Sequence, residues 1–441
     1  MKRPASPPPL TGLGFMDSFD KVRALHRATA YLHWDELRHR SVPDGGDVKT
    51  WWLQLKAIRR LSYVEVALRD TSGAPFRFSI PNDLHRKVHE LDRIMSGHAD
   101  VPAEVKGATR DRYLLAGMRE EAIRSSQLEG AVTTRKDAIE MLRTGRSPLT
   151  NDERMIANNY AAIQWIRDQV HQPLTPAMLI EVQRILTEGA IDVADGAGRL
   201  RRPDEKVEVV DPNDGDVVHT PPPAEQLEAR LATMCEFANS PDPPGAFIHP
   251  VLRSITLHFW LAYDHPFVDG NGRTARALFY WSMLRQGYWL TEFITISKII
   301  REAPAQYARA FLFTETDDND LTYFYFHQID VLDKSLRALF DYLAKEKSET
   351  SDLARRLERV NVNPRQLALL SHALRKPATE YTIASHQQRH GIVYDTARVD
   401  LLDLAKQGFL ARRKRGREFV FVGGRKLQAL ATGEPPRRSR R

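Results

Sequence analysis

The sequence is almost free of cysteine: Cys235 is the only one among 441 residues. A single thiol excludes an intrachain disulfide and favours a reducing compartment. Cys235 stands in the segment LEARLATMCEFAN, whose apolar residues recur at helical spacing. We therefore expect a small buried apolar side chain there and not a reactive thiol.

Long apolar runs are also missing. No stretch approaches the ~20 apolar residues that a membrane span needs. The first residues, MKRPASPPPL, lack the apolar segment of a secretory signal. We expect a cytoplasmic protein with no membrane partner and a flexible N-terminus over residues 1–11. A hydrophobic content of 42% and a charged content of 27% exclude a disordered chain and are typical of a globular protein.

The net charge of +7 is unevenly distributed. Residues 409–441 contain eleven Lys or Arg against two Glu, a local charge of +9, so residues 1–408 sum to −2. Any argument for nucleic-acid binding therefore belongs to the C-terminal end. Residues 426–441 are expected to be a basic tail, and the alternative to nucleic-acid binding is that its extreme end, EPPRRSRR, is unstructured and only aids solubility.

The patterns predict a mainly α protein with several parts. Residues 12–100 combine helical periodicity with aromatic residues and predict a helical N-terminal domain. Residues 101–345 are also mostly helical. Within them, segment 199–221 holds two short β-like runs on either side of Pro212-Asn213-Asp214-Gly215, a hairpin signal. A lone hairpin among helices suggests a flap over a site.

The C-terminal part reads as a separate module. The charged stretch 347–359 is expected to be a linker, and residues 352–425 show the order helix, helix, helix and basic hairpin, with the hairpin turning at Arg415-Gly416. That order is typical of a winged helix-turn-helix. Asp395 or Thr396 is the expected cap of the third helix.

The segment HPFVDGNGRTAR, His265 to Arg276, brings together residues suited to phosphate chemistry. His265 can take a proton from a hydroxyl near neutral pH. Asp269 is a hard oxygen ligand that suits Mg²⁺. Gly270 and Gly272 let backbone N–H groups close around an anion at the start of a helix.

Three further side chains extend this pattern. Asn271 can donate from its amide. Arg273 and Arg276 lie one helical turn apart, and two guanidiniums beside an anion site suit a polyphosphate chain. Together these residues predict Mg²⁺-dependent transfer of a phosphate-containing group.

The segment resembles the signature of the Fic (filamentation induced by cAMP) domain family, HPFx[DE]GNGRxxR, at every fixed position. The resemblance extends from about Ala122 to about Leu343. It includes Ile248-His249-Pro250, the prolines after the hairpin and the string DDNDLTYF. It implies a mainly helical Fic-type core that transfers AMP from ATP to a Ser, Thr or Tyr hydroxyl of a target protein and releases pyrophosphate.

The resemblance also implies a role for each residue. His265 would be the catalytic base, and Asp269 would hold Mg²⁺ between the α- and β-phosphates. The α-phosphate would lie on Gly270, Asn271 and Gly272. The β- and γ-phosphates would lie on Arg273 and Arg276. Phe267 would pack inward as an anchor.

In the family the flap docks the target by strand addition and lines the nucleotide. Val207 and Val209 are the candidates here, with Tyr307 near adenine and Thr314 beside it. Plain packing is the alternative for each of these four. Gln183 departs from the family, whose helices often carry His there, and is expected to alter only core hydrogen bonding.

Residues 125–130, SSQLEG, resemble the inhibitory helix of the family, [ST]xxxE[GN], which is expected around residues 120–130. Ser125, Glu129 and Gly130 occupy its fixed positions. A carboxylate at Glu129 can pair with Arg276, which then cannot hold the γ-phosphate in the productive pose.

The sequence thus predicts an autoinhibited protein adenylyltransferase that uses ATP and Mg²⁺. Two alternatives stay open: a DNA-binding regulator whose Fic core senses nucleotide, and transfer of another group on the same fold. The target, the base preference, removal of AMP, duplex DNA binding and a homodimer are not decided by the sequence.

Overall fold

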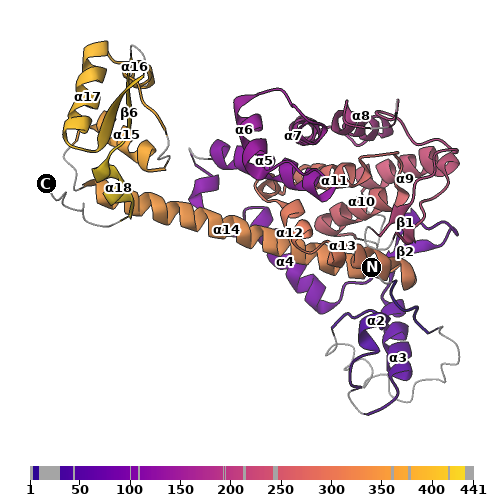
Figure 1. Ribbon diagram of the computed structural model, residues 1–441. Helices are drawn as coiled ribbons and strands as arrows, with labels where there is room; N and C mark the ends of the chain where they lie inside the picture. The colour runs from indigo at the N-terminus through magenta and orange to yellow at the C-terminus, as the bar shows by residue number, and fades with distance from the viewer. Residues whose placement is uncertain are drawn as a thin grey trace. The chain divides into compact units, whose positions relative to one another are not determined.

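The computed structural model describes residues 3–8, 30–42, 45–99, 101–107, 110–191, 193, 195–211, 215–241, 247–358, 362–375, 379–415 and 418–432. They belong to two compact units, Met1–Phe340 and Asp341–Arg441. Helices dominate both units, and the described strands pair into two-stranded antiparallel sheets (Figure 1). The expected mainly α fold is confirmed. Among the described helices, none combines the length and apolar character needed to cross a membrane.

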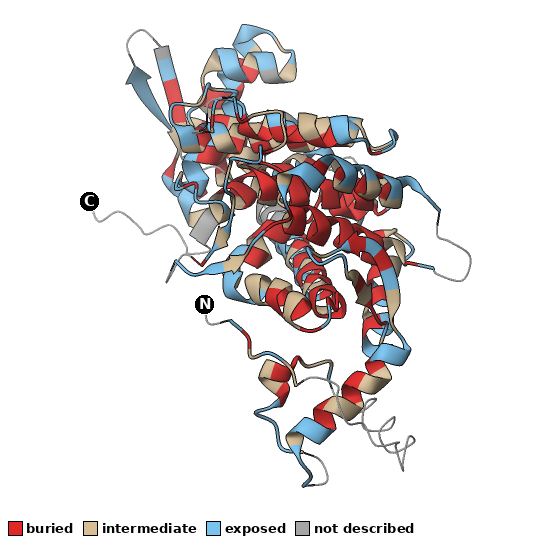
Figure 2. Ribbon diagram, turned by 90° about the vertical axis from the view of Figure 1, so that its right-hand side faces the viewer, coloured by how far each residue is buried: buried red, intermediate tan, exposed pale blue. Residues whose placement is uncertain are grey.

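Two adjacent helices form the centre of the larger unit. They are α10 (Pro250–Asp264) and α11 (Asn271–Arg285), which pack against each other. Every residue of α10 except Pro250 and Ala262 is buried, as its apolar sequence predicts. Figure 2 shows buried residues gathered in the helices at the middle of this unit. The turn between α10 and α11 carries the glycine-rich motif.

The described part of the larger unit contains further helices. In chain order they are α2 (Trp34–Leu37), α3 (Val48–Leu61), α4 (Asn82–Met95), α5 (Arg110–Leu128), α6 (Arg135–Thr144), α7 (Asn151–Asp168), α8 (Pro176–Thr187), α9 (Leu227–Asn239), α12 (Ile296–Glu302), α13 (Pro304–Thr316) and the start of α14 (Thr322–Glu358). Short 3₁₀ turns lie at Ala103–Val105, Ala224–Gln226 and Trp289–Glu292. Helices α5, α7 and α8 pack on α11, and α9 packs on α10.

Cys235 lies in α9 and is 6% exposed. Burial raises the pKa of its thiol to about 12, so the thiol stays protonated at neutral pH. The expectation of a buried, unreactive cysteine is confirmed.

The predicted flap is present. Strand β3 (Val209–Val210) pairs antiparallel with β4 (Val217–His219). Gly215 adopts φ +75°, which suits a glycine at the hairpin turn. The other three residues expected at this turn, 212–214, lie outside the described residues.

A second hairpin, which the sequence analysis did not anticipate, lies in the N-terminal region. Strand β1 (Val64–Arg69) pairs with β2 (Pro75–Phe78). The burial of β1 alternates with a period of two, so the signal was present in VEVALR. Phe76 packs on Tyr263 of α10, with ring centroids 5.0 Å apart. The N-terminal region therefore shares a core with α10.

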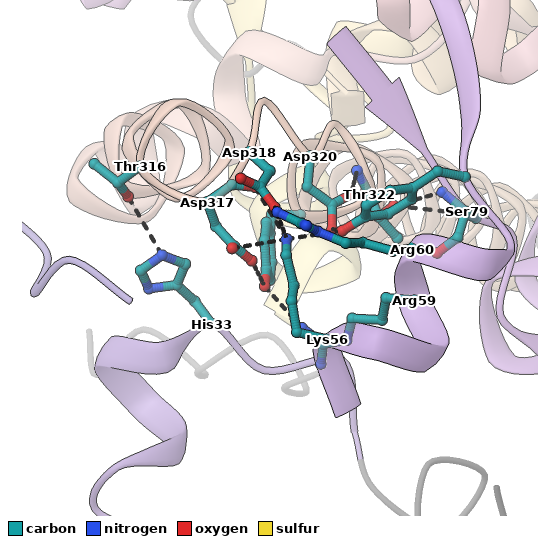
Figure 3. Close-up of polar contacts among 12 residues, drawn as sticks. His33, Lys56, Arg59, Arg60, Ser79, Thr316, Asp317, Asp318, Asp320 and Thr322 are labelled. Atoms are coloured by element: carbon teal, nitrogen blue, oxygen red, sulfur yellow. Dashed lines mark hydrogen bonds and ion pairs between the residues drawn. The ribbon is translucent and has the colours of Figure 1, made fainter. Parts of the chain in front are cut away.

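Polar contacts connect α3 to the loop between α13 and α14 (Figure 3). The Lys56 ammonium lies 2.7 Å from the Asp317 carboxylate, and both side chains are 2% exposed. Tyr63 donates to Asp320 at 2.7 Å. The loop passes through the left-handed region at Asp318, φ 59°. Since α13 lines the site described below, α3 helps to hold one of its walls.

The smaller unit follows α14. It contains α15 (Pro364–Arg375), α16 (Ile383–His390), α17 (Tyr394–Lys406), β5 (Leu410–Arg415), β6 (Glu418–Gly423) and α18 (Arg425–Thr432). Its core contains Leu370, Leu401 and Phe421, each fully buried. The order of three helices and an antiparallel ribbon is the expected one.

Three details differ from expectation. Residues 347–358 continue α14 and are not a linker, since this charged stretch lacks Gly and Pro and consists mostly of good helix formers. Helix α17 begins after Val393 without a side-chain cap, so Asp395 and Thr396 lie in its first turn. The segment expected as a basic tail begins as helix α18, and residues 433–441 and Gly416 lie outside the described residues.

Candidate active site

A cavity of about 350 Å³ lies where the ends of α5, α10 and the flap meet α11 and α13. It contains most of the predicted site residues. From the motif it is lined by His265, Asp269, Gly270, Asn271, Gly272 and Arg276. Around them lie Leu128, Glu129, Val209, Val218, His219, Ala262, Tyr263, Val268, Tyr307, Ala308, Phe311, Leu312 and Glu315.

His265 follows the last residue of α10 in a left-handed conformation, φ 44°, which is unusual for a residue other than glycine. Its Nδ1 lies 3.1 Å from the carbonyl oxygen of Ala262. A carbonyl only accepts, so Nδ1 carries the proton and Nε2 is the basic nitrogen. Burial lowers the pKa of His265 to about 4. The imidazole is therefore neutral at pH 7 and free to take a proton.

The turn after His265 is fixed by its own side chains. Asn271 accepts from the backbone N–H of Phe267 at 2.9 Å and donates to the Phe267 carbonyl at 2.8 Å. Phe267 is fully buried, as expected of an anchor. The Asn271 amide is thus engaged within the turn. The donors that remain for an anion are backbone N–H groups of the first turn of α11, which have no partner inside the helix.

Asp269 is 44% exposed at the edge of the cavity. Its carboxylate accepts from Arg273 at 2.9 Å and from the N–H of Gly270 at 2.6 Å. Arg273 is 1% exposed and also donates to the carbonyl of Leu186 at 3.1 Å. Arg273 therefore lies under the turn and does not line the cavity.

The described residues contain no group of three or more His, Cys, Asp or Glu that could hold a metal ion. A single carboxylate such as that of Asp269 can nevertheless bind Mg²⁺, without other protein ligands. This ion is commonly bound by one or two carboxylates together with water and substrate phosphates. An exposed carboxylate at the edge of an anion site matches that donor set.

Arg276 is 2% exposed and is held by α5 and the residue after it. It donates to Glu129 Oε1 at 2.8 Å and to Ser125 Oγ at 2.9 Å. Burial acts to raise the pKa of Glu129, but the charge of Arg276 outweighs it and the pKa is lowered. Gly130 follows with φ +102°, a conformation that favours glycine. The predicted pairing of Glu129 with Arg276 is what the structure shows.

Of the residues predicted near the nucleotide, two line the cavity and two do not. Val209 and Tyr307 line it. The Tyr307 hydroxyl lies 2.9 Å from His258 Nε2. Thr314 is fully buried and donates to Ala310 in its own helix. Val207 is half-buried and is not part of the cavity wall.

Sequence reasoning missed several residues of the cavity, among them the titratable His219 and Glu315. They form a hydrogen-bonded pair at 2.8 Å. The signal was slight: His219 stands in the run DVVHT that predicted the hairpin. Gln183 behaves as expected of a core residue, since it donates to the Asp269 carbonyl at 3.1 Å and accepts from the Gly198 N–H at 2.6 Å.

Parts of the chain are similar in sequence to known proteins. The chain is 28% identical over 216 residues to "Protein adenylyltransferase Fic" of Nematostella vectensis, which covers 46% of this chain and 47% of that protein. It is 26% identical over 218 residues to "Protein adenylyltransferase fic-1" of Caenorhabditis elegans, covering 48% and 40%. The chain thus spans less than half the length of these curated relatives.

A solved structure shares the fold. The crystal structure of a Fic family protein from Desulfovibrio desulfuricans matches with a TM-score of 0.52 and 19% identity, over 79% of this chain and 98% of that one. Residues 173–283 match the family model described as Fic/DOC family. They contain α8, the flap, α9, α10 and most of α11, including the whole motif. Residues 173–283 of this chain are therefore similar to the Fic/DOC family.

Proposed function

We propose that the chain transfers AMP from ATP to a Ser, Thr or Tyr hydroxyl of a target protein, and that Glu129 holds it inactive. One observation carries the proposal: a neutral His265, the N-terminal turn of α11 and Arg276 face a single cavity. The names of the curated relatives support the same activity.

Each part of the proposed reaction is assigned to residues of this chain. The target oxygen forms a bond to the α-phosphorus while the bond from that phosphorus to the β-phosphate oxygen breaks. The hydroxyl proton passes to Nε2 of His265, and pyrophosphate leaves. Backbone N–H groups of α11 stabilise the charge on the α-phosphate. Asp269 would hold Mg²⁺, whose charge neutralises the phosphates.

Arg276 and Glu129 carry the proposed inhibition. Glu129 and Ser125 accept from Nε and Nη2 of Arg276, which leaves fewer donors for a γ-phosphate. Glu129 is 32% exposed and stands just beyond α5, so it can be displaced at a smaller cost than a residue within the helix. ATP would then bind in the productive pose only when Glu129 leaves.

The test measures transfer of labelled AMP, with ATP and Mg²⁺, by Glu129→Gly and by Glu129→Gly with His265→Ala. We expect label on the enzyme or on added protein in the first case only. Loss of a general base costs about 10²–10⁴ in rate. Equal labelling by both variants would contradict the role of His265, and no labelling by either would contradict the transfer itself.

The smaller unit carries a second proposed function. We propose that it is a winged helix-turn-helix that binds the backbone of duplex DNA through β5. Arg412, Arg413, Lys414 and Arg415 of β5 are all exposed. Four exposed basic side chains on one strand suit phosphate contacts. The exposed face of α17, with Val399 64% exposed, favours the alternative of a protein partner.

A further inference from the structure

His219, at the end of flap strand β4, has both ring nitrogens engaged. Nδ1 lies 2.8 Å from Oε2 of Glu315 on α13, and Nε2 lies 2.7 Å from the carbonyl oxygen of Tyr263 on α10. A carbonyl oxygen and a carboxylate both accept hydrogen bonds, so both nitrogens must donate. The geometry therefore requires an imidazolium, or else a proton on Glu315.

The surroundings favour the charge on the imidazole. The side chain of His219 is 9% exposed and that of Glu315 is 21% exposed, so the pair is only partly screened by water. The other carboxylate that faces His219, Asp264, is already paired with Arg230 at 2.6 Å. Burial acts to lower the pKa of His219, but Glu315 and the Tyr263 carbonyl outweigh it and the pKa is raised.

The pair joins three parts of the site. His219 ends the flap, Glu315 belongs to the cavity wall on α13, and Tyr263 lies two residues before His265. The ring of His219 also packs on Tyr263, with centroids 4.7 Å apart. The short strands of the flap, two and three residues long, supply little stability of their own. This contact therefore helps to hold the β4 end of the flap in position.

We propose that protonated His219 is a clasp that fastens the flap to α13 and to the turn before His265, and that loss of its proton releases the flap. His219 is thus a positioning residue. The regulation of transfer by this clasp rests on the function proposed above, whereas the ordering of the flap does not.

The direction of the pH effect follows from the raised pKa. A histidine whose pKa is higher in the folded protein stabilises its contact fully below its ordinary pKa of about 6.5. That contribution is lost as the pH rises through the folded value. Flap order should therefore fall as the pH rises above the ordinary value of about 6.5, whereas His265 stays neutral throughout that range.

The experiment measures amide hydrogen exchange of β3 and β4 in the full chain without nucleotide, from about pH 6 to about pH 9, as protection factors corrected for the intrinsic rate. In the wild type we expect protection to fall by about tenfold across this range, the effect of losing one charge-assisted hydrogen bond. Glu315→Gln is the matched variant. Its amide can donate to a neutral His219, so it should keep the contact and abolish the pH step.

Two further variants complete the test. Glu315→Ala should leave the flap poorly protected at every pH, and His85→Gln, at an exposed histidine of α4, should keep the wild-type step. The clasp would be overturned if the protection factors of β3 and β4 did not change with pH in the wild type. It would also be overturned if they fell with pH in Glu315→Gln as they do in the wild type.

Transfer by Glu129→Gly supplies a separate readout. The charge of His219 contributes to the lowered pKa of His265, so adding His219→Gln should move the acid limb of the rate profile to higher pH. If AMP is transferred, but neither the transfer rate nor the hydrogen-exchange protection of the flap falls at alkaline pH, the proposed function stands and the clasp is wrong. If the protection of the flap falls with pH but the protein transfers no AMP, the clasp stands and the proposed function is wrong.

Discussion

Arg276 donates to Oε1 of Glu129 across 2.8 Å, and a β-carbon built on Gly272 would lie 2.2 Å from that same oxygen. The glycine of the motif therefore leaves room for the carboxylate as well as for a phosphate. One small volume, between Arg276 and the first turn of α11, can be occupied by either the carboxylate or the phosphate.

The first prediction concerns the coupling of this pair. Glu129→Gly frees Arg276, so the rate of AMP transfer should rise. Arg276→Ala added to it should cancel most of the gain, because both changes act through one ion pair. The four proteins of this double-mutant cycle are compared by labelled-AMP transfer and by ATP affinity. Additive effects would show that Glu129 acts elsewhere.

Gly272→Ala gives the second prediction. Its methyl group would push Glu129 aside, since the carboxylate is the end of a flexible side chain. The same methyl group would crowd a phosphate on the turn. In the wild-type background these effects oppose each other. In the Glu129→Gly background only the second remains, so the substitution should lower transfer there by a larger factor. A loss of the same size in both backgrounds would contradict the close contact between Glu129 and Gly272.

The motif could be recognised in the sequence because its residues are contiguous. The pairing of Arg276 with Glu129, 147 positions apart, could be expected only because residues 125–130 resemble the inhibitory helix of the Fic family. Arg273 could not be placed in this way. It lies i, i+4 from Asp269, and that local ion pair, with the Leu186 carbonyl, holds its guanidinium under the turn. Asn271 likewise serves the turn itself. Spacing shows which residues share a helix face, but not which partners they find.

Long-range contacts account for the remaining differences. The clasp of His219 joins residues 44 and 96 positions apart, and no periodicity encodes it. Hairpin β1–β2 carried an alternating pattern, but its aromatic residues fit a helical core equally well. Its true setting, with Phe76 against Phe259 and Tyr263, depends on residues nearly two hundred positions away.

The third prediction concerns the pH dependence of transfer by Glu129→Gly. His265 has a pKa of about 4 because burial disfavours its charged form. It therefore remains a base down to about pH 5, and the rate should fall only as the pH approaches 4. An unperturbed histidine would lose activity below about pH 6.5. An acid limb centred near that value would show that His265 is more exposed to water than the structure indicates.

The fourth prediction concerns Lys56 and Asp317, both 2% exposed. Asp317→Asn leaves the buried ammonium without its nearest counter-ion, and breaking a buried pair in this way costs about 3–5 kcal/mol. Thermal or denaturant unfolding measures the loss. Lys56→Met added to it should restore part of the stability. Arg60→Ala breaks the more exposed pair with Asp318 and is the control, with an expected loss of about 0–1 kcal/mol. An equal loss in both cases would contradict the burial of Lys56.

The last prediction separates DNA binding from protein binding by the smaller unit. Each phosphate that a basic side chain contacts should add about 0.9 to the slope of log affinity against log salt for duplex DNA. Replacing Arg412, Arg413 and Lys414 by Ala in the full chain should therefore flatten the slope by up to about 2.7 and weaken binding to every sequence alike. Replacing the exposed Tyr394 and Val399 of α17 tests whether this helix, and not β5, carries the binding surface. If DNA affinity is absent at low salt, the ribbon does not bind the DNA backbone, and the apolar face of α17 is then the surface on which a protein partner would dock.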